Sequence, residues 1–171
     1  MTAFAPALPH LRLVDGPTGG RALGAPVTMS SFCGRCGAAP ADERDPGRPR
    51  VCPACALGVI LRTRSDVAPV LDGAFLVVDS SLSVQAVSAR AEAVLAVREL
   101  HAINRHVLEL LIPADSDPAA TVSLPLAITH AAAGDDRVES LHVRPGNVFG
   151  VQLRARITSC GLPRAALVAL A

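Results

Sequence analysis

Cys33-Gly34-Arg35-Cys36 and, after fifteen intervening residues, Cys52-Pro53-Ala54-Cys55 supply four of the five cysteines in this chain of 171 residues. A Cys-x-x-Cys turn lets two thiolates hold one metal ion, and two such turns complete the tetrahedral set of ligands that Zn²⁺ prefers. The spacing falls within the range of structural zinc modules with four cysteine ligands. We therefore predict a structural Zn²⁺ site formed by all four cysteines. A disulfide framework and an iron site with the same four thiolates are the alternatives.

The residues that follow the two pairs predict different local structures. Gly37 follows the first pair and suits a positive φ, which turns backbone N–H groups toward the sulfur atoms. After the second pair an apolar run begins at Ala56, and thiolates are favoured at a helix N-terminus. We therefore expect the second pair to open an amphipathic helix over residues 57–70. That arrangement gives a treble-clef-like knuckle at residues 31–62 rather than a two-hairpin zinc ribbon.

Composition and charge limit the classes of function. Half of the residues are hydrophobic and the net charge is +1, which gives no general attraction to nucleic acid or to an acidic membrane. The N-terminal residues lack the pattern of a signal peptide, and no apolar run reaches the ~18 residues of a membrane span. We expect a cytoplasmic protein, where paired cysteines favour metal over disulfides. Cys160 is expected to be a small buried residue of a strand.

From Phe75 onward the hydrophobic pattern predicts an α+β domain. Helices are expected at residues 89–95, with Ser88 as N-cap, at 99–112, stopped by Pro113, and at 119–133, stopped by Gly134. Strict alternation over residues 148–157 places Phe149 and every second residue after it on one apolar face. The remaining strands are expected at residues 75–78, 84–87, 138–143 and 165–170.

Several of these segments resemble a PAS domain. Phe75-Leu76-Val77-Val78-Asp79 and Val84-Gln85-Ala86-Val87-Ser88 resemble the opening strand pair of that family, and Ala93-Val94-Leu95 the helix that follows. Residues 108–113 resemble the helix that ends before a proline, and residues 151–170 the last two strands. The resemblance covers about residues 66–171. It implies a five-stranded antiparallel sheet with short helices on one face. The chain then divides into a flexible tail (1–30), the zinc module (31–62) and a PAS-like domain with an N-terminal helix (63–171).

The resemblance also implies where a ligand would bind. A cavity beneath the helices would be lined by residues such as Val77, Ile103, Leu110, Ile128 and Leu153. His130 lies on the helix where haem-binding relatives place their iron ligand. The alternative is that His130 is an exposed residue near a helix C-terminus, where a positive charge is favoured. A small-molecule ligand or haem is therefore the predicted second cofactor beside zinc.

Function follows from these elements rather than from a catalytic motif. The sequence has no recognisable nucleophile and base, no phosphate-binding glycine loop and no paired carboxylates outside turns, so we expect a protein that is not an enzyme. The leading hypothesis is a PAS-type sensor or adaptor in signalling or transcription regulation. It would bind a small ligand or a protein partner and would form a homodimer through the 57–70 helix and the exposed sheet face.

A second hypothesis makes the zinc module a nucleic-acid-binding element or a scaffold, with the PAS-like part only dimerising. The phosphate contacts would come from Arg35, Arg44, Arg48 and Arg50. Neighbouring acidic residues (Asp42, Glu43 and Asp45) offset these charges.

Overall fold

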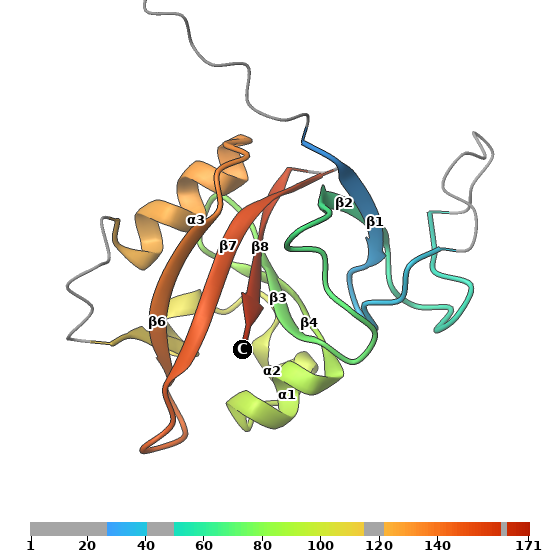
Figure 1. Cartoon of the computed structure of the whole chain (residues 1–171). Helices are drawn as coiled ribbons and strands as arrows, with labels where there is room; N and C mark the ends of the chain where they lie inside the picture. The colour runs from blue at the N-terminus through green and yellow to red at the C-terminus, as the bar shows by residue number, and fades with distance from the viewer. Residues whose placement is uncertain (1–26, 41–49, 115–121, 162–163) are drawn as a thin grey trace, which may run out of the picture.

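The computed structural model describes residues 27–40, 50–114, 122–161 and 164–171, and within them one antiparallel sheet carries helices on one face (Figure 1). Along the chain the elements are β1 (Met29–Cys33), β2 (Ile60–Arg64), β3 (Ala74–Val78), β4 (Val84–Val87), α1 (Ala89–Leu95), α2 (Glu99–Ala102), the 3₁₀ turn η1 (Val107–Glu109), β5 (Leu111–Pro113), α3 (Leu124–Ala133), β6 (Glu139–Pro145), β7 (Leu153–Gly161) and β8 (Ala165–Leu170). Among the helices of these residues, none is long and apolar enough to cross a membrane.

The sheet contains the five expected strands in the order β4-β3-β8-β7-β6, but it is larger than the predicted five-stranded sheet. It has eight strands, because β5 adds to β6 and the β1–β2 pair adds to β7. The nine-residue β7 is long enough to have two neighbours on one edge. Its first half pairs with β6, and Cys160 and Gly161 at its end pair with Thr63 and Arg62 of β2.

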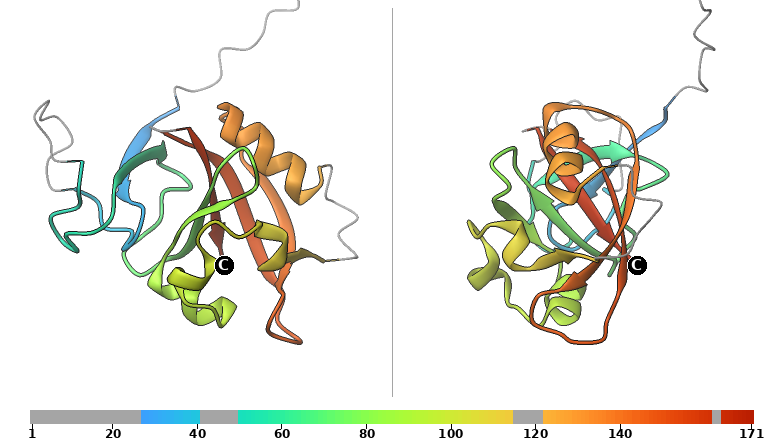
Figure 2. Two further views of the ribbon diagram at one scale, coloured as in Figure 1. Left: turned by 180° about the vertical axis from the view of Figure 1, so that it is seen from behind. Right: turned by 90° about the vertical axis from the view of Figure 1, so that its left-hand side faces the viewer.

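The two faces of the sheet bury separate hydrophobic clusters. On the helix side, α1, α2 and α3 cover β3, β4, β7 and β8, and α3 buries Leu124, Ala127, Ile128, Ala131 and Ala132 (Figure 2). The opposite face is covered by the segment that contains the cysteine pairs. There the cluster consists of Phe32, Leu61, Val67, Phe75, Val77, Cys160, Ala165 and Leu167. The cysteine segment therefore packs on the face of the sheet that carries no helix.

The prediction of a helix over residues 57–70 is wrong. Residues 60–64 form β2, in which Leu61 and Thr63 are buried while Arg62 is exposed, the period-two pattern of a strand. Pairing with β1 on one side and β7 on the other supplies the hydrogen bonds that decide between strand and helix. The predicted boundary between residues 62 and 63 lies within this strand, and residues 1–26 of the predicted tail lie outside the described residues.

Three further elements depart in part from the sequence prediction. Residues 99–112 are not one helix, because α2 ends at Ala102, Asn104 has a φ of 63°, and Leu111–Pro113 pairs with β6 as β5. The strand expected from residue 148 begins at Leu153, and Phe149 is 99% exposed at the β6–β7 turn beside Gly150, whose φ is 74°. The N-terminal end of the helix predicted at 119–133 lies partly outside the described residues.

Other local predictions are confirmed. Ser88 is the N-cap of α1, and its Oγ accepts a hydrogen bond from the backbone N–H of Ala91 at 3.2 Å. Gly134 ends α3 with a φ of 101°, a conformation in which a side chain would be strained. Cys160 is buried within β7, and this burial raises the pKa of its thiol to about 12.

Candidate metal centre and adjoining pocket

Two similar backbone turns carry the four cysteines. In the first turn the N–H of Gly37 donates to the carbonyl oxygen of Cys33 at 3.0 Å, and in the second the N–H of Ala56 donates to that of Cys52 at 2.8 Å. Gly37 has a φ of 75° and Ala56 a φ of 55°, so both pairs end in the same left-handed conformation. The second pair therefore forms a turn like the first and does not open a helix, even though alanine carries a Cβ that disfavours this conformation.

The sulfur atoms form one compact cluster, which confirms that these four cysteines lie together. Their Sγ atoms all lie within 4.8 Å of one another, with Cys33 and Cys55 separated by 3.6 Å and Cys36 and Cys52 by 3.9 Å. None of the five cysteines is in a disulfide. Four sulfurs bound at about 2.3 Å to one tetrahedral Zn²⁺ would lie about 3.8 Å apart. The cluster thus has the donor set and the spacing of a structural metal site.

Backbone N–H groups point at two of the sulfurs. The N–H groups of Arg35 and Cys36 lie 3.4 and 3.5 Å from the Sγ of Cys33, and that of Gly58 lies 3.4 Å from the Sγ of Cys55. The N–H groups of Gly58 and Leu57 lower the pKa of Cys55 to about 6, because they stabilise the thiolate. Burial raises the pKa of Cys33 to about 12 and also raises that of Cys36. A bound cation would replace the protons on these two thiols.

Close contacts leave no room for a side chain at two glycines beside the cysteine pairs. A Cβ on Gly58 would lie 2.2 Å from the Sγ of Cys33, and a Cβ on Gly37 would lie 2.6 Å from the carbonyl oxygen of Val70. Sequence reasoning identified Gly37 but missed Gly58 and Ala56. The signal for Gly58 was available, since it is the third residue after Cys55 within an otherwise apolar run.

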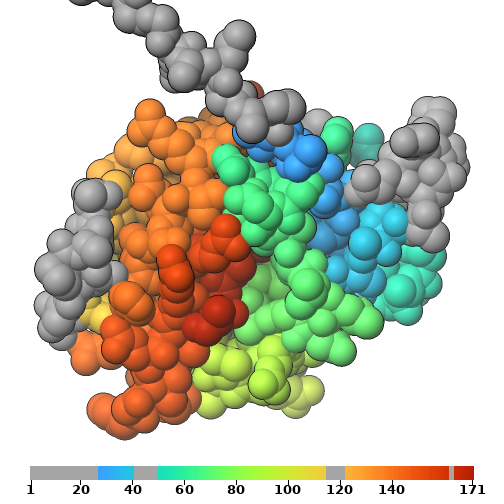
Figure 3. Space-filling view, in the orientation of Figure 1, coloured from blue at the N-terminus to red at the C-terminus, as the bar shows by residue number. Residues whose placement is uncertain are grey.

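Packing and polar contacts fix the module (residues 27–40 and 50–64) on the sheet. The ring of Phe32 meets that of Phe75 edge to face, with centroids 5.7 Å apart. The Oγ1 of Thr63 donates to the carbonyl oxygen of Ser159 at 2.8 Å, and Arg35 is ion-paired with Glu99 of α2. Burying a side chain such as Phe32 contributes about 1.5–3 kcal/mol. In the space-filling view the blue-to-cyan part of the module (residues 27–40) lies directly against the green part of the chain (Figure 3).

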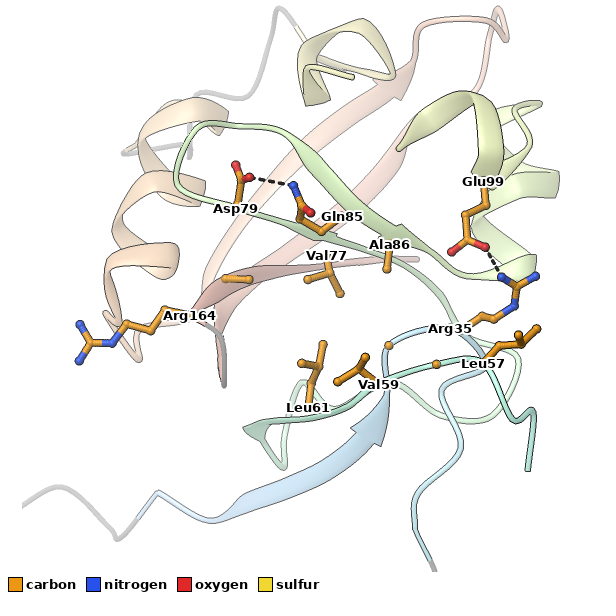
Figure 4. Close-up of a pocket in the computed structure, with 13 residues that line it drawn as sticks. Arg35, Leu57, Val59, Leu61, Val77, Asp79, Gln85, Ala86, Glu99 and Arg164 are labelled. Atoms are coloured by element: carbon orange, nitrogen blue, oxygen red, sulfur yellow. Dashed lines mark hydrogen bonds and ion pairs between the residues drawn. The ribbon is translucent and has the colours of Figure 1, made fainter. Parts of the chain in front are cut away.

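A pocket of about 400 Å³ lies between this module and the sheet. Val59 and Leu61 of the module point toward Val77 and Ala86 of the sheet across it (Figure 4). Gly34, Arg35 and Gly58 from the two cysteine turns also line this space. Arg35 and Glu99 stand at one end and Arg164 at the other (Figure 4). The backbone that surrounds the sulfur cluster therefore forms one wall of the pocket.

Of the five residues predicted to line a ligand cavity, four lie in or against one cluster, and Val77 lies on the other face of the sheet. Leu110 and Ile128 are buried in the helix-side core, and Ile103 and Leu153 pack against it. Val77 lies in the cluster on the other face, and of the five only Val77 borders the pocket. The physical reason is the alternation of β3, whose neighbouring side chains point to opposite faces of the sheet.

His130 lies in the last turn of α3 with an exposed side chain. This position agrees with the alternative interpretation of an exposed histidine near a helix C-terminus. Among the arginines proposed for phosphate contacts, Arg35 is engaged by Glu99, Arg50 is exposed beside the second turn, and Arg44 and Arg48 lie outside the described residues.

No protein-family profile matches the sequence, and no curated protein sequence matches it. Among solved structures, the PAS domain of nitrogen regulation protein NR(II) from Vibrio parahaemolyticus is similar, with 15% sequence identity and a TM-score of 0.44. The match covers 58% of this chain and 88% of that one. The chain itself combines an antiparallel sheet, with helices on one face, and a four-cysteine module on the other.

Proposed function

We propose that the four cysteines hold a structural Zn²⁺ ion and that the protein is a sensor or adaptor in signalling or transcription regulation, not an enzyme. The observation that carries this proposal is the joining of the cysteine cluster to the PAS-like sheet. The module contributes two strands to that sheet and buries Phe32 and Leu61 against it. A metal ion bound there would fix the module as a permanent part of the sheet's surface.

The donor set supports a structural role for the metal. Four thiolates would fill the tetrahedral positions of a bound Zn²⁺, which would leave no open position for a water molecule or substrate. When bound, the ion would stabilise the fold of the module, while residues of the chain hold and orient the thiolates. N–H groups of Arg35, Cys36 and Gly58 orient the thiolates, and the side chain of Arg35 bridges the first turn to Glu99 of α2. A structural change in the first cysteine turn would therefore be transmitted to α2 of the PAS-like part through this ion pair.

The partners of this sensor are a small ligand or another protein, and we retain the homodimer as part of the proposal. The interface predicted on a 57–70 helix is wrong, because that segment is β2 and a turn, so a dimer must use another surface. Sedimentation of the zinc-loaded protein at micromolar concentration tests this point, since a monomer throughout would remove the dimer from the proposal.

Native mass spectrometry of the full chain, purified without chelator, tests the central claim. We expect one zinc per chain, and a co-purifying ligand mass or protein partner would support the sensor or adaptor role. Absence of metal, or iron in place of zinc, would refute the zinc assignment. As a control, a variant with Cys36 and Cys52 both changed to serine should lose the metal. A Cys160→Ser variant should retain it, because this thiol lies outside the cluster.

A further inference from the structure

The pocket between the cysteine module and the sheet has the size and lining of a small-molecule site. Its volume of about 400 Å³ falls in the range of about 300–1,000 Å³ that is usual for ligand pockets. The apolar part of the lining comes from Val59 and Leu61 on the module and from Val77, Ala86 and Ala165 on the sheet. It lies on the face of the sheet that the module covers, with Glu99 of α2 at one end, and it is separate from the cavity predicted beneath the helices.

The charged groups at the pocket argue for a neutral ligand. Two arginines and two acidic residues line it, so their formal charges cancel, and all four already have partners. Arg35 is paired with Glu99, and Arg164 donates to the carbonyl oxygen of Ala133 at 3.2 Å. Asp79 accepts from the N–H groups of Ser81 and Ser83 at 2.8 and 3.0 Å and from Gln85. A charged ligand would have to break one of these interactions.

Gln85 offers a specific polar contact. Its Nε2 donates to the Oδ2 of Asp79 at 2.8 Å, and a carboxylate can only accept, so the orientation of the amide is fixed. The Oε1 of Gln85 is then left as an acceptor at the edge of the pocket (Figure 4). A ligand that carries a hydroxyl or N–H donor on an apolar body matches this arrangement.

The position of the pocket links it to the metal. Gly34 and Arg35 belong to the first cysteine turn, Gly58 donates its N–H to Cys55, and all three line the pocket. The N–H of Gly34 also bonds the carbonyl oxygen of Val59 at 2.9 Å, which joins the first turn to the apolar wall. A ligand seated here would contact both cysteine turns and the sheet, so it would stabilise the arrangement that holds the metal.

We propose that this pocket binds a neutral, mainly apolar small molecule with one hydrogen-bond donor, and that its binding is coupled to metal binding at the four cysteines. The proposal deepens the sensor function and rests on the zinc site. Reciprocity requires that a ligand bound more tightly by the zinc-loaded form strengthens zinc binding by the same factor.

The test uses the zinc-loaded full chain and the fluorescent probe N-phenyl-1-naphthylamine, which is neutral, apolar and carries one N–H. We expect saturable binding of one probe per chain. Ala86→Phe fills the pocket and should weaken probe binding at least tenfold, whereas Ala89→Phe adds the same ring at an exposed position of α1 and should leave it unchanged.

A second pair of variants covers the case in which Ala86→Phe does not fold. Leu57 lines the pocket and is 69% exposed, while Leu100 is 66% exposed and is not part of the lining. Leu57→Ala should weaken probe binding several-fold and Leu100→Ala should not. Absence of saturable binding, or equal effects of both members of a pair, would overturn the proposal.

Zinc transfer to a chromophoric chelator tests the coupling. Saturating probe should lower the zinc dissociation constant of the protein at least fivefold, so that less zinc passes to the chelator. An unchanged constant with the probe bound would overturn the coupling. The zinc content of each sample separates the two proposals. A protein without zinc refutes the proposed function, whereas a zinc-loaded protein that binds no probe refutes only the pocket.

Discussion

Gly58→Ala should disrupt the proposed zinc site mainly through one steric contact. The added Cβ would lie 2.2 Å from the Sγ of Cys33, 2.9 Å from the Cβ of Arg35 and 3.1 Å from the backbone nitrogen of Arg35. Relief of the first contact requires the sulfur to move by about 1.4 Å, taking an ordinary carbon–sulfur contact as about 3.6 Å. Metal–sulfur distances tolerate only about 0.2 Å. Cys33 therefore cannot stay in place as a ligand.

The expected loss is at least about 100-fold in zinc affinity, or about 2.8 kcal/mol, since every tenfold step is worth about 1.4 kcal/mol. Backbone strain is not the cause, because the φ of Gly58 is not in the left-handed region. Gly161→Ala is the matched control: a Cβ there meets nothing within 4 Å, so zinc affinity should be unchanged. Competition with a chromophoric chelator measures both variants. A Gly58→Ala protein whose zinc affinity stays within twofold of the wild-type value would refute the reasoning.

Three further predictions concern the module and the core. Ala56→Gly should raise the stability of the zinc-loaded protein by about 0.5 kcal/mol, measured by thermal unfolding. The reason is that removing the Cβ strain at a φ of 55° gains about 1–2 kcal/mol, which exceeds the entropy cost of glycine of about 0.4–1 kcal/mol. An unchanged or lower unfolding midpoint would contradict this. Phe32→Ala should lower the free energy of unfolding by about 3–5 kcal/mol in denaturant, because it removes the buried ring that packs against Phe75. A loss below about 1 kcal/mol would show that the module is not packed as described. Burial raises the pKa of the Cys160 thiol from 9.0 to about 12, so the stability it contributes is complete below pH 9 and is lost as the pH rises toward 12. Cys160→Ala should therefore lose less stability over this pH range than the wild-type protein. An identical dependence of stability on alkaline pH in both proteins would contradict the raised pKa.

The cysteine cluster could be predicted from the sequence because its signal is local. Two Cys-x-x-Cys turns specify their own backbone, and nothing distant is needed to bring each pair of thiols together. Ser88 and Gly134 were predictable for the same reason, since a cap and a left-handed helix end depend on residues within one turn.

The sequence predictions were wrong where pairing with a strand distant in the sequence decides the local structure. Residues 60–64 have apolar positions that fit a helix or a strand, and the choice depends on β7, which lies about a hundred residues further along the chain. Residues 111–113 likewise become a strand only through β6. The pocket escaped prediction because it forms between two segments whose contact was not evident in the sequence. Phe149 was misplaced because alternation alone does not show where a hairpin turn interrupts a strand.

The shared edge of β7 sets an order for assembly during synthesis. Thr63 bonds Ser159 across 96 residues, so the β1–β2 pair leaves the ribosome long before the strand that receives it. Contacts of such large sequence separation form late, because a long loop must close first. The cysteine turns, by contrast, are complete once residue 58 has emerged. The proposed zinc ion could therefore bind before the module docks, and the nascent chain would then hold a metal-loaded cysteine module before its C-terminal strands are made.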